Sequence, residues 1–526
     1  VVLSYRLRGL FKMAQTTKKK KKRRSRGIIG FIISLFMLVV AIALPIQVFK
    51  LKILPMAYFI LLTIIILSLA FVLFIIRTFK AKRFTRFLCT ILCLVLTVVL
   101  TVGNVYIYKT GQMFEQITNL TTKTTNTITL TTMANSPIQE AAELEGKRVG
   151  IIPEIDQEGT QRALDELKDI NFKTIEYEDV YTCADDLYDG SIDAMVLNDA
   201  FLGILHDEER FTLFTTQTKQ IHKTIFYTDR EKVLDVTADR VDVESEPFVV
   251  LICGNDSYGS LNEVSRCDVN MLVTVNPNTG TILMSSIPRD FYVEVKGNDE
   301  EIPAGSMDKL THTGLLGIET TEASLENLLG ININYTVRVN FSSLVKLVDA
   351  LGGVDVKVEK GLAVDTFYSN STLEGVKEGM NHLDGERALA FARERHAYED
   401  GDNQRVINQQ IVLSAIINKM TSPSMILHYG TFVDAIGGAF ETDMPNEDIQ
   451  KFLRFEISHF PNWKFESHAM YGYSSYEYCM MLGGTAFVFI PEPLSVECGS
   501  KKIKAVLDGQ SSDTVNEADY IPTYEY

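Results

Sequence analysis

Two aspartates in the middle of the chain lie beside apolar segments that we predict to be strands. Asp256 follows the segment Phe248–Gly254 in "GNDSYG", and Asp268 precedes "VNMLVTVN". If these strands are neighbours in one sheet, both carboxylates lie at the same sheet edge, where α/β sheets commonly bind ligands. Two carboxylates without histidine or cysteine ligands suit a hard cation such as Mg²⁺, with Mn²⁺ as the alternative. Two aspartates that only cap turns would produce the same pattern, so the pair alone leaves both interpretations open.

Arginine side chains collect in the same half of the sequence, although the chain is acidic, with a formal net charge of −16. Three of them lie in "RERHAYEDGDNQRVINQQ" (Arg393–Gln410). The planar guanidinium group donates a fork of hydrogen bonds that matches phosphate oxygens, and it stays charged at physiological pH. The cluster therefore indicates an anion-binding site, whereas any one arginine is more typical of a solvated surface. The candidate donors are Arg266, Arg289, Arg393, Arg395, Arg405 and Gln409.

Spacing within this cluster adds a geometric expectation. Arg405 and Gln409 are four residues apart, so they share one face of a predicted helix. Arg393 and Arg395 share a side if the chain is extended at that point. The neighbouring residues are expected only to face water, and they are Glu394, His396, Glu399 and Asp400.

A mixed sheet between helical layers is the α/β fold that must position these residues, over residues 248–500. The apolar run Phe248–Gly254 is typical of a strand that is buried on both faces. "VNMLVTVN" and "TILMSSIP" are joined by a turn at Pro277–Gly280, which predicts an antiparallel hairpin. Further strands are predicted at "YTVRVNF" and "VDVKVE", and helices at "ASLENLLG", "SSLVKLVDALGG", "GERALAFAR", "RVINQQIVLSAIINKM" and "NEDIQKFLRF".

A smaller α/β unit is predicted over residues 138–241, where strand-like and helix-like segments alternate. It resembles one lobe of a periplasmic solute-binding protein, and we assign it an accessory role without chemistry of its own. Residues 109–137 are rich in threonine and are predicted to be a linker that leads into a strand, because "TITLT" alternates polar and apolar residues. Residues 510–526 form an acidic tail for which we expect no ordered structure.

Three apolar segments within residues 28–108 are predicted to span a membrane. Each exceeds the roughly 20 residues that cross about 30 Å of hydrocarbon. The first 108 residues contain 18 Lys and Arg and no Asp or Glu, and the run "KKKKKRRSR" precedes the first segment. The positive-inside rule therefore places residues 1–27 in the cytoplasm and the large C-terminal part outside a multi-pass plasma-membrane protein. The basic run is a topology signal rather than an arm that binds nucleic acid, so no nucleic acid is expected as a partner.

The seven cysteines form no recognisable disulfide framework or zinc site. Cys253 ends an apolar run and is expected to be buried, whereas Cys183 and Cys267 stand apart. Cys479 and Cys498 could pair outside the membrane, which their spacing alone does not establish.

Several separated blocks of the sequence resemble the LytR-CpsA-Psr family. These blocks are Gly254–Val293, Leu347–Val356 and Leu383–Gln410, and the similarity covers most of residues 248–420. The three predicted spans and the accessory unit are most similar to the CpsA branch. The resemblance implies a phosphotransferase of cell-wall biogenesis in the Gram-positive envelope. It would move a capsule- or teichoic-acid-type glycopolymer from an undecaprenyl-pyrophosphate carrier to peptidoglycan, beside other capsule-assembly membrane proteins in the lipid bilayer.

The same resemblance implies roles for individual residues. Asp256 and Asp268 correspond to ligands of Mg²⁺, and the five arginines and Gln409 correspond to contacts with the pyrophosphate. Asp402 matches an acidic position near the site, and its role is left open. Three positions depart from the wider family pattern and affect carrier or polymer preference more than the reaction class; they are Tyr258, Cys267 and Asn408.

Two other functions fit the same set of residues. The outer part could bind the lipid carrier without turnover, as a regulator or sensor of the envelope. It could also act as a polyprenyl-pyrophosphate pyrophosphatase, with water as the acceptor. The combination of Asp, Arg and Gln positions favours the transferase.

Overall fold

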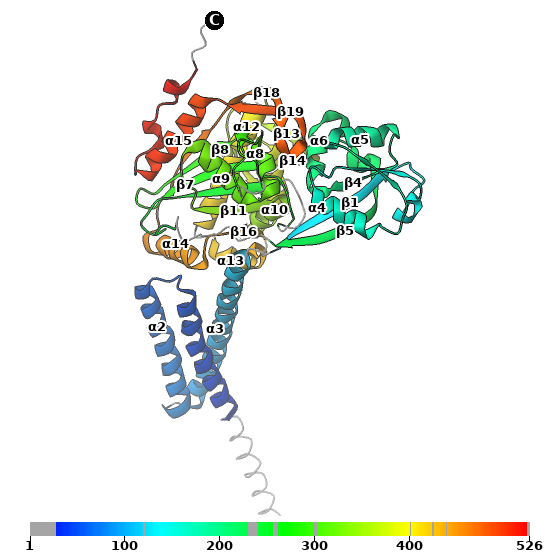
Figure 1. The fold of residues 1–526 in the computed structure, drawn as a ribbon. Coiled ribbons are helices and arrows are strands. Elements are labelled where there is room, and N and C mark those ends of the chain that lie inside the picture. Colours follow the sequence, from blue (N-terminus) through cyan, green and yellow to red (C-terminus); the bar gives the residue numbers. More distant parts are fainter. Residues whose placement is uncertain are drawn as a thin grey trace, which may run out of the picture. The chain divides into compact units, whose positions relative to one another are not determined.

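The computed structural model describes residues 28–80, 82–118, 123–229, 240–255, 261, 263–297, 302–399, 401–422, 425–437 and 439–522 (Figure 1). Asp256, Tyr258, Asp400 and the basic residues 1–27 lie outside these ranges, as does the side chain of Asp402. Contacts divide the chain into two compact units, residues 1–115 with 446–460 and residues 116–445 with 461–526. Each unit is described separately below.

The first unit contains three helices that are long and apolar enough to cross a membrane. They span Ile28–Leu51, Met56–Phe79 and Arg83–Thr118, which confirms the three predicted apolar spans. Many of their large apolar side chains are exposed, as expected for helices whose surroundings are hydrocarbon. In Figure 1 the second and third are α2 (Met56–Ile75, continued by the π-helical turn Ile76–Lys80) and α3 (Arg83–Thr118). The amphipathic helix α14 (Asn446–His459) belongs to the same unit.

Within the second unit, residues 123–229 form a five-stranded α/β domain, which we call the accessory domain. Its strand order is β3-β2-β4-β1-β5, in which β2 runs parallel to β3 and β4. The strands are β1 (Lys123–Met133), β2 (Arg148–Ile151), β3 (Lys173–Glu176), β4 (Ala194–Asn198) and β5 (Thr218–Asp229). The helices are α4 (Gln157–Glu166), α5 (Val180–Asp189), α6 (Leu202–Asp207) and α7 (Phe214–Gln217), with short 3₁₀ turns at Asp199–Phe201 (η3) and Glu209–Phe211.

The threonine-rich segment contributes a strand that lies inside this sheet. β1 pairs antiparallel with both β4 and β5. Ile128 and Leu130 are buried on one face of β1, and Thr129 and Thr131 are buried on the other, so the strand is covered on both sides. Over the described residues, the accessory domain therefore begins at Lys123 rather than at the predicted boundary, residue 138. The threonine-rich composition resembles that of a linker and does not indicate that this segment pairs with strands far away in the sequence.

The main domain, residues 248–445 and 461–522, is built on a mixed six-stranded sheet in the order β16-β11-β6-β7-β8-β17. The strands are β6 (Phe248–Asn255), β7 (Val269–Asn276), β8 (Thr281–Ile287), β11 (Tyr335–Asn340), β16 (Phe440–Thr442) and β17 (Lys464–Ala469). β6, β7 and β8 are antiparallel neighbours, and β11 and β17 extend the sheet in parallel pairs. This arrangement confirms the predicted α/β fold class and the predicted β7–β8 hairpin.

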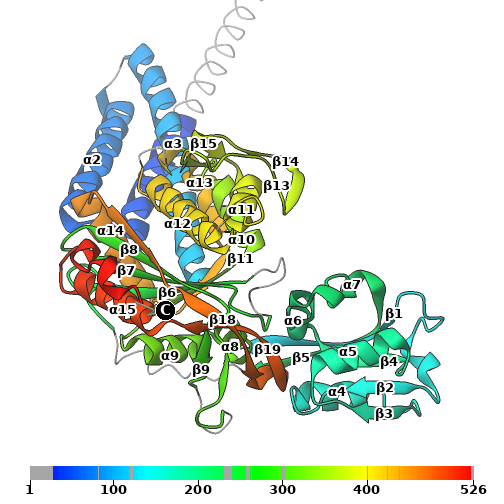
Figure 2. The ribbon, with the colours of Figure 1, turned by 90° about the horizontal axis from the view of Figure 1, so that it is seen from above.

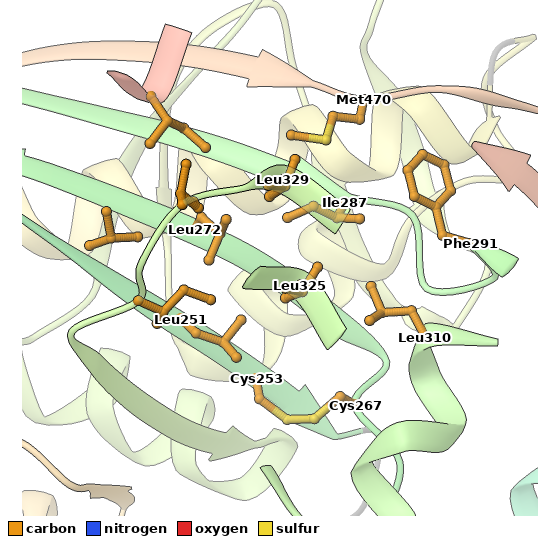
Figure 3. Close-up of a cluster of buried hydrophobic side chains, with 14 of the residues drawn as sticks. Leu251, Cys253, Cys267, Leu272, Ile287, Phe291, Leu310, Leu325, Leu329 and Met470 are labelled. Carbon is orange, nitrogen blue, oxygen red and sulfur yellow. A yellow bond between two sulfur atoms is a disulfide. The ribbon is translucent and has the colours of Figure 1, made fainter. Parts of the chain in front are cut away.

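Helices cover both faces of this sheet (Figure 2). On one face α9 (Ile318–Leu329) and α15 (Pro493–Leu507) bury Leu325 and Ile503 against Leu251 and Leu272 of the sheet (Figure 3). On the other face lie α10 (Phe341–Ala350), α11 (Gly385–Arg393), α12 (Gly401–Met420) and α13 (Met425–Ile436). Smaller pieces are α8 (Leu310–Thr313) and the strand pairs β9–β10 (Tyr292–Glu294, Met307–Lys309), β12–β15 (Val354–Val358, Gly379–Leu383), β13–β14 (Val364–Phe367, Asn370–Val376) and β18–β19 (Gly472–Cys479, Gly484–Pro491).

The cysteine pairing differs from the expectation. Cys253 and Cys267 form a disulfide across the ends of β6 and β7 (Figure 3), while Cys479 and Cys498 are buried free thiols. The register of β6 and β7 places Cys253 opposite Asn270, and the segment before β7 brings Cys267 back to it, with 5.3 Å between the two Cα atoms. The disulfide holds the end of β6 and the start of β7, where Asp268 directly precedes the strand.

Replacing both disulfide cysteines, Cys253→Ser with Cys267→Ser, is expected to lower the free energy of unfolding by about 3 kcal/mol, the loop-entropy value for a closed loop of roughly this length. The sequence separation of the two cysteines is 14. Urea unfolding of the full chain, followed by circular dichroism, measures the difference. The control is Cys498→Ser, which removes a thiol without breaking a cross-link, and equal midpoints for the two variants would contradict the prediction.

The acidic tail is also ordered over the described residues, contrary to the expectation. It contains the short turns Ser512–Thr514 and Glu517–Tyr520. The carboxylate of Glu517 lies 3.1 Å from Nδ1 of His468 and 3.3 Å from Nζ of Lys502, whose side chain is buried. The tail is held because it supplies a counter-charge to a buried lysine, a role that its composition alone does not indicate.

Candidate functional site

One cavity of the second unit collects the predicted site residues whose side chains the structure describes. Its volume is about 760 Å³. Asn255, the last residue of β6, also lines it, and Asp256 follows Asn255 directly in the sequence. The predicted residues on its wall are Arg266 and Asp268 before β7, Arg289 after β8, Arg393 at the end of α11, Arg395 beyond it, and Arg405 and Gln409 on α12.

Four charged side chains that line this cavity form a closed ring of ion pairs. One of them, Asp207, was not among the predicted site residues. Asp268 Oδ1 accepts a hydrogen bond from Arg289 Nη1 at 2.7 Å and lies 3.5 Å from Arg266 Nη2. Asp207 Oδ1 accepts from Arg289 Nη2 at 3.0 Å, and Asp207 Oδ2 accepts from Arg266 Nη1. Two guanidinium groups and two carboxylates thus alternate, and Thr311 donates a further hydrogen bond to Asp268 at 3.2 Å.

The ring is charged but formally neutral. Burial raises the pKa of Asp207, but the positive charges of Arg266 and Arg289 outweigh it and hold the pKa below its usual value. Burial likewise disfavours the cation of Arg289, yet Asp268 and Asp207 raise its pKa above the usual value. Because Asp207 and Asp268 offset Arg266 and Arg289, the ring itself adds no net charge, and the other arginines on the cavity wall are Arg393, Arg395 and Arg405.

Those three arginines come from α11, the segment after it, and α12. The guanidinium carbon of Arg393 lies 4.3 Å from the ring centre of Phe341, which fixes the side chain by a cation–π contact. Arg395 donates from Nε to the ring nitrogen of His396 at 3.3 Å. Arg405 and Gln409 both line the cavity, as their common helix face predicts.

Glu394, between the two arginines, does not face water as expected. Its side chain is buried and accepts hydrogen bonds from the backbone N–H groups of Tyr368 at 2.7 Å and Ala397 at 3.2 Å. The carboxylate therefore ties the end of α11 to the β13–β14 turn. This anchor holds the backbone from which Arg393 and Arg395 reach the cavity.

The accessory domain forms a wall of the same cavity, which the sequence did not indicate. α6 supplies Asp207, and its Gly203 leaves room for Arg266, because a Cβ at Gly203 would lie 2.7 Å from Arg266 Nη2. β1 reaches the main domain through a bridge between Thr125 and Glu263. The local sequence around Asp207 is acidic and predicts a helix end that faces solvent. The contact of Asp207 with Arg266 and Arg289 follows only from the packing of the accessory domain against the main domain.

Residues 211–477 match the model of the LytR_cpsA_psr family. Two relatives from Bacillus cereus and Bacillus anthracis carry the name polyisoprenyl-teichoic acid–peptidoglycan teichoic acid transferase TagU. The first is 31% identical over 248 residues, 46% of this chain and 76% of the relative. The second is 34% identical over 212 residues, 40% of this chain and 65% of the relative. The crystal structure of Bacillus subtilis TagV is 27% identical, with a TM-score of 0.41 over 50% of this chain and 98% of that chain.

Proposed function

Because this chain belongs to the LytR_cpsA_psr family, we propose that it is a membrane-anchored transferase of the cell envelope. It moves a teichoic-acid- or capsule-type glycopolymer from an undecaprenyl-pyrophosphate carrier to peptidoglycan. The observation that carries the proposal is the cavity in which five arginines, far apart in the sequence, meet Asp268 and Gln409. A family relationship alone would not place these donors together.

The reaction needs charge stabilisation more than covalent help from the protein. A sugar hydroxyl of peptidoglycan attacks the phosphorus next to the polymer, and its oxygen forms the new phosphodiester bond. The bond between that phosphorus and the bridging oxygen breaks, so polyprenyl phosphate leaves with the electron pair, while the hydroxyl proton passes to solvent. Negative charge on the phosphoryl oxygens and on the leaving group is stabilised by preorganised cations. Arg393, Arg395 and Arg405 are the cations proposed to contact those oxygens, beside the neutral ring that fixes Asp268.

Mg²⁺ is the proposed cofactor, with Mn²⁺ as a substitute, held by Asp256 and Asp268. The donor chemistry fits, since Asp268 presents a carboxylate at the cavity and Asn255 lies on the cavity wall one residue before Asp256. When bound, the cation would neutralise charge on the phosphate oxygens. Asp402, on α12, is kept as an acidic neighbour of this site without an assigned role.

Chelation with EDTA is expected to abolish release of polyprenyl phosphate by the full chain, and added Mg²⁺ is expected to restore it. The reason is that pyrophosphate oxygens then lack the cation that shares their charge. A direct readout is Mn²⁺ binding followed by electron paramagnetic resonance, which should weaken in Asp268→Asn. Undiminished turnover in EDTA would remove the metal from the proposal.

The site is proposed to lie outside the plasma membrane, with the N-terminus in the cytoplasm. The distribution of Lys and Arg around the apolar segments supports this orientation. The Cys253–Cys267 disulfide adds support, because disulfides form and persist in oxidising compartments outside the cytoplasm. Anchoring in the bilayer would keep the cavity near a lipid-linked substrate and raise its effective concentration.

The full chain in lipid nanodiscs, supplied with a defined undecaprenyl-pyrophosphate-linked polymer and peptidoglycan, tests this function. The expected products are polyprenyl phosphate and a polymer joined to peptidoglycan by a phosphodiester. Release of polyprenyl phosphate without the new linkage would identify a pyrophosphatase instead. Binding of the carrier with neither product would identify a sensor.

Arg393→Ala is expected to weaken binding of the lipid-linked polymer by about tenfold or more, because a charge-assisted contact to phosphate contributes roughly 1.5–3 kcal/mol. Isothermal titration calorimetry of the full chain measures the dissociation constant. Arg162→Ala is the matched control, since Arg162 also lies over an aromatic ring, that of Phe226 at 4.6 Å, but outside the cavity. Equal affinity of the Arg393→Ala variant and wild type would remove Arg393 from the site.

A further inference from the structure

The cavity has a second half whose chemistry differs from that of the arginine cluster. The accessory domain lines it with two hydroxyls from Thr125 and Thr127 on β1, the side chains of Asn198 at the end of β4 and of Asp199 directly after it, and the ammonium group of Lys223 on β5. Lys223 interacts electrostatically with Asp199, and Glu263 of the main domain adds a second carboxylate to this part of the wall. A surface of hydroxyl and amide groups with one cation and two carboxylates suits a neutral ligand with many hydroxyl groups better than a polyanion.

These accessory side chains are held in place by the domain's own hydrogen bonds. Asp199 accepts from the buried Thr129 hydroxyl at 2.8 Å. The Asn198 amide donates to Asp156 at 2.7 Å, and its oxygen accepts from the backbone N–H of Ala200 at 3.0 Å. The wall is therefore preorganised, which reduces the cost of ordering side chains when a ligand binds.

An aromatic surface belongs to the same cavity. The ring of Tyr368 lies against that of His396, with centroids 3.9 Å apart, and both residues line the cavity. Tyr368 lies in the turn of the β13–β14 hairpin and is 72% exposed, so its ring is accessible to a ligand. An exposed aromatic face beside polar groups can pack against the C–H face of a sugar ring while its hydroxyls are hydrogen-bonded elsewhere.

The size of the cavity agrees with a ligand larger than pyrophosphate. A volume of about 760 Å³ lies within the range of roughly 300–1,000 Å³ found for pockets that enclose drug-sized molecules. The arginine cluster forms one part of the cavity wall, and the accessory-domain residues form another part. A pyrophosphate group with an attached sugar would contact both parts.

We infer that the accessory domain builds a saccharide subsite, in which Thr127, Asn198, Asp199 and Lys223 hydrogen-bond the carrier-proximal sugar and Tyr368 packs against its ring. This inference rests on the proposed function, because the arginine cluster must hold the pyrophosphate for the first sugar to reach the accessory wall. Such a subsite would make the accessory domain a determinant of which glycopolymer the protein accepts.

The test compares two probes on the full chain in detergent: undecaprenyl pyrophosphate, and undecaprenyl pyrophosphate that carries a disaccharide. The variant is Lys223→Ala combined with Tyr368→Ala, since both side chains are exposed. Its affinity for the disaccharide probe is expected to fall at least about tenfold, since one charge-assisted hydrogen bond and one ring contact are lost, with no change for the sugar-free probe.

The matched control is Lys173→Ala combined with Tyr473→Ala, which changes an exposed lysine and an exposed tyrosine outside the cavity and should bind both probes like wild type. Equal losses for both probes, or no loss for either, would overturn the saccharide subsite. Failure of the proposed carrier binding at the arginine cluster gives a different result, because the wild-type protein would then bind neither probe.

Discussion

Asp268→Asn is expected to reduce transfer of polymer to peptidoglycan by at least about a hundredfold, the scale seen when one preorganised electrostatic group is removed from an active site. Asp268 is buried, and its Oδ1 lies 2.7 Å from Arg289 Nη1 and 3.5 Å from Arg266 Nη2. The amide preserves the size of the side chain but removes the charge that orients both guanidinium groups. The same charge is proposed to bind Mg²⁺, so two contributions are lost together.

Initial rates of polyprenyl phosphate release and of phosphodiester formation, measured on the full chain in nanodiscs, check this result. Asp355→Asn is the matched control, because Asp355 also forms an ion pair, with His382 at 2.8 Å, but is exposed and outside the cavity. Circular dichroism separates a lost function from a lost fold. A folded Asp268→Asn protein that transfers polymer at the wild-type rate would contradict the role given to this residue.

Asp207→Ala is expected to lower the free energy of unfolding by roughly 1–3 kcal/mol, because it removes a hydrogen-bonded carboxylate from the buried guanidinium group of Arg266. Arg266, whose side chain is only 4% exposed, loses its closest carboxylate, and Arg289 loses one of its two ring partners. The two guanidinium groups are then free to shift, so we also expect a lower rate of transfer. The effect would come from a residue that lies outside the matched family region, which begins at residue 211.

The pH dependence of this stability difference follows from the lowered pKa of Asp207. Although burial raises that pKa, Arg266 and Arg289 lower it further, so folding favours the ionised carboxylate. Its contribution is fully present above the pKa of an unfolded aspartate, about 3.9, and is lost as the pH falls through the lower native value. Urea unfolding at pH 7 and at acidic pH should therefore show the wild type and the variant converging under acid.

Asp185→Ala serves as the control for Asp207→Ala. Asp185 pairs with Arg210 at 3.1 Å in the same accessory domain, but both side chains are exposed. Exposed pairs contribute roughly 0–1 kcal/mol, so this variant should unfold close to wild type at every pH. If the two variants lose equal stability, the ring does not couple the accessory domain to the site.

Local patterns in the sequence were sufficient for much of the framework. The three membrane-spanning helices of the first unit were predicted from their apolar runs. A helix that crosses a bilayer needs roughly 20 consecutive apolar residues, and such a run can be recognised in the sequence directly. Alternation and apolar runs located β6, β7 and β8, and helix periodicity placed Arg405 and Gln409 on one face of α12. These features depend on neighbours a few residues apart, so the sequence determines them directly.

Contacts between distant segments were decided only by the tertiary structure. The path of the chain before β7 placed Cys267 beside Cys253 of β6 as its disulfide partner. A hydrogen bond to the backbone N–H of Tyr368, in the β13–β14 turn, holds Glu394 in a buried position. The docking of α6 against the main domain placed Asp207 between Arg266 and Arg289. A carboxylate at a helix end has the same local pattern whether it meets water or two arginines. The sequence by itself therefore determined which residues could bind an anion. The packing of the domains decided that Arg266 and Arg289 also contact Asp207, because that contact joins segments far apart in the sequence.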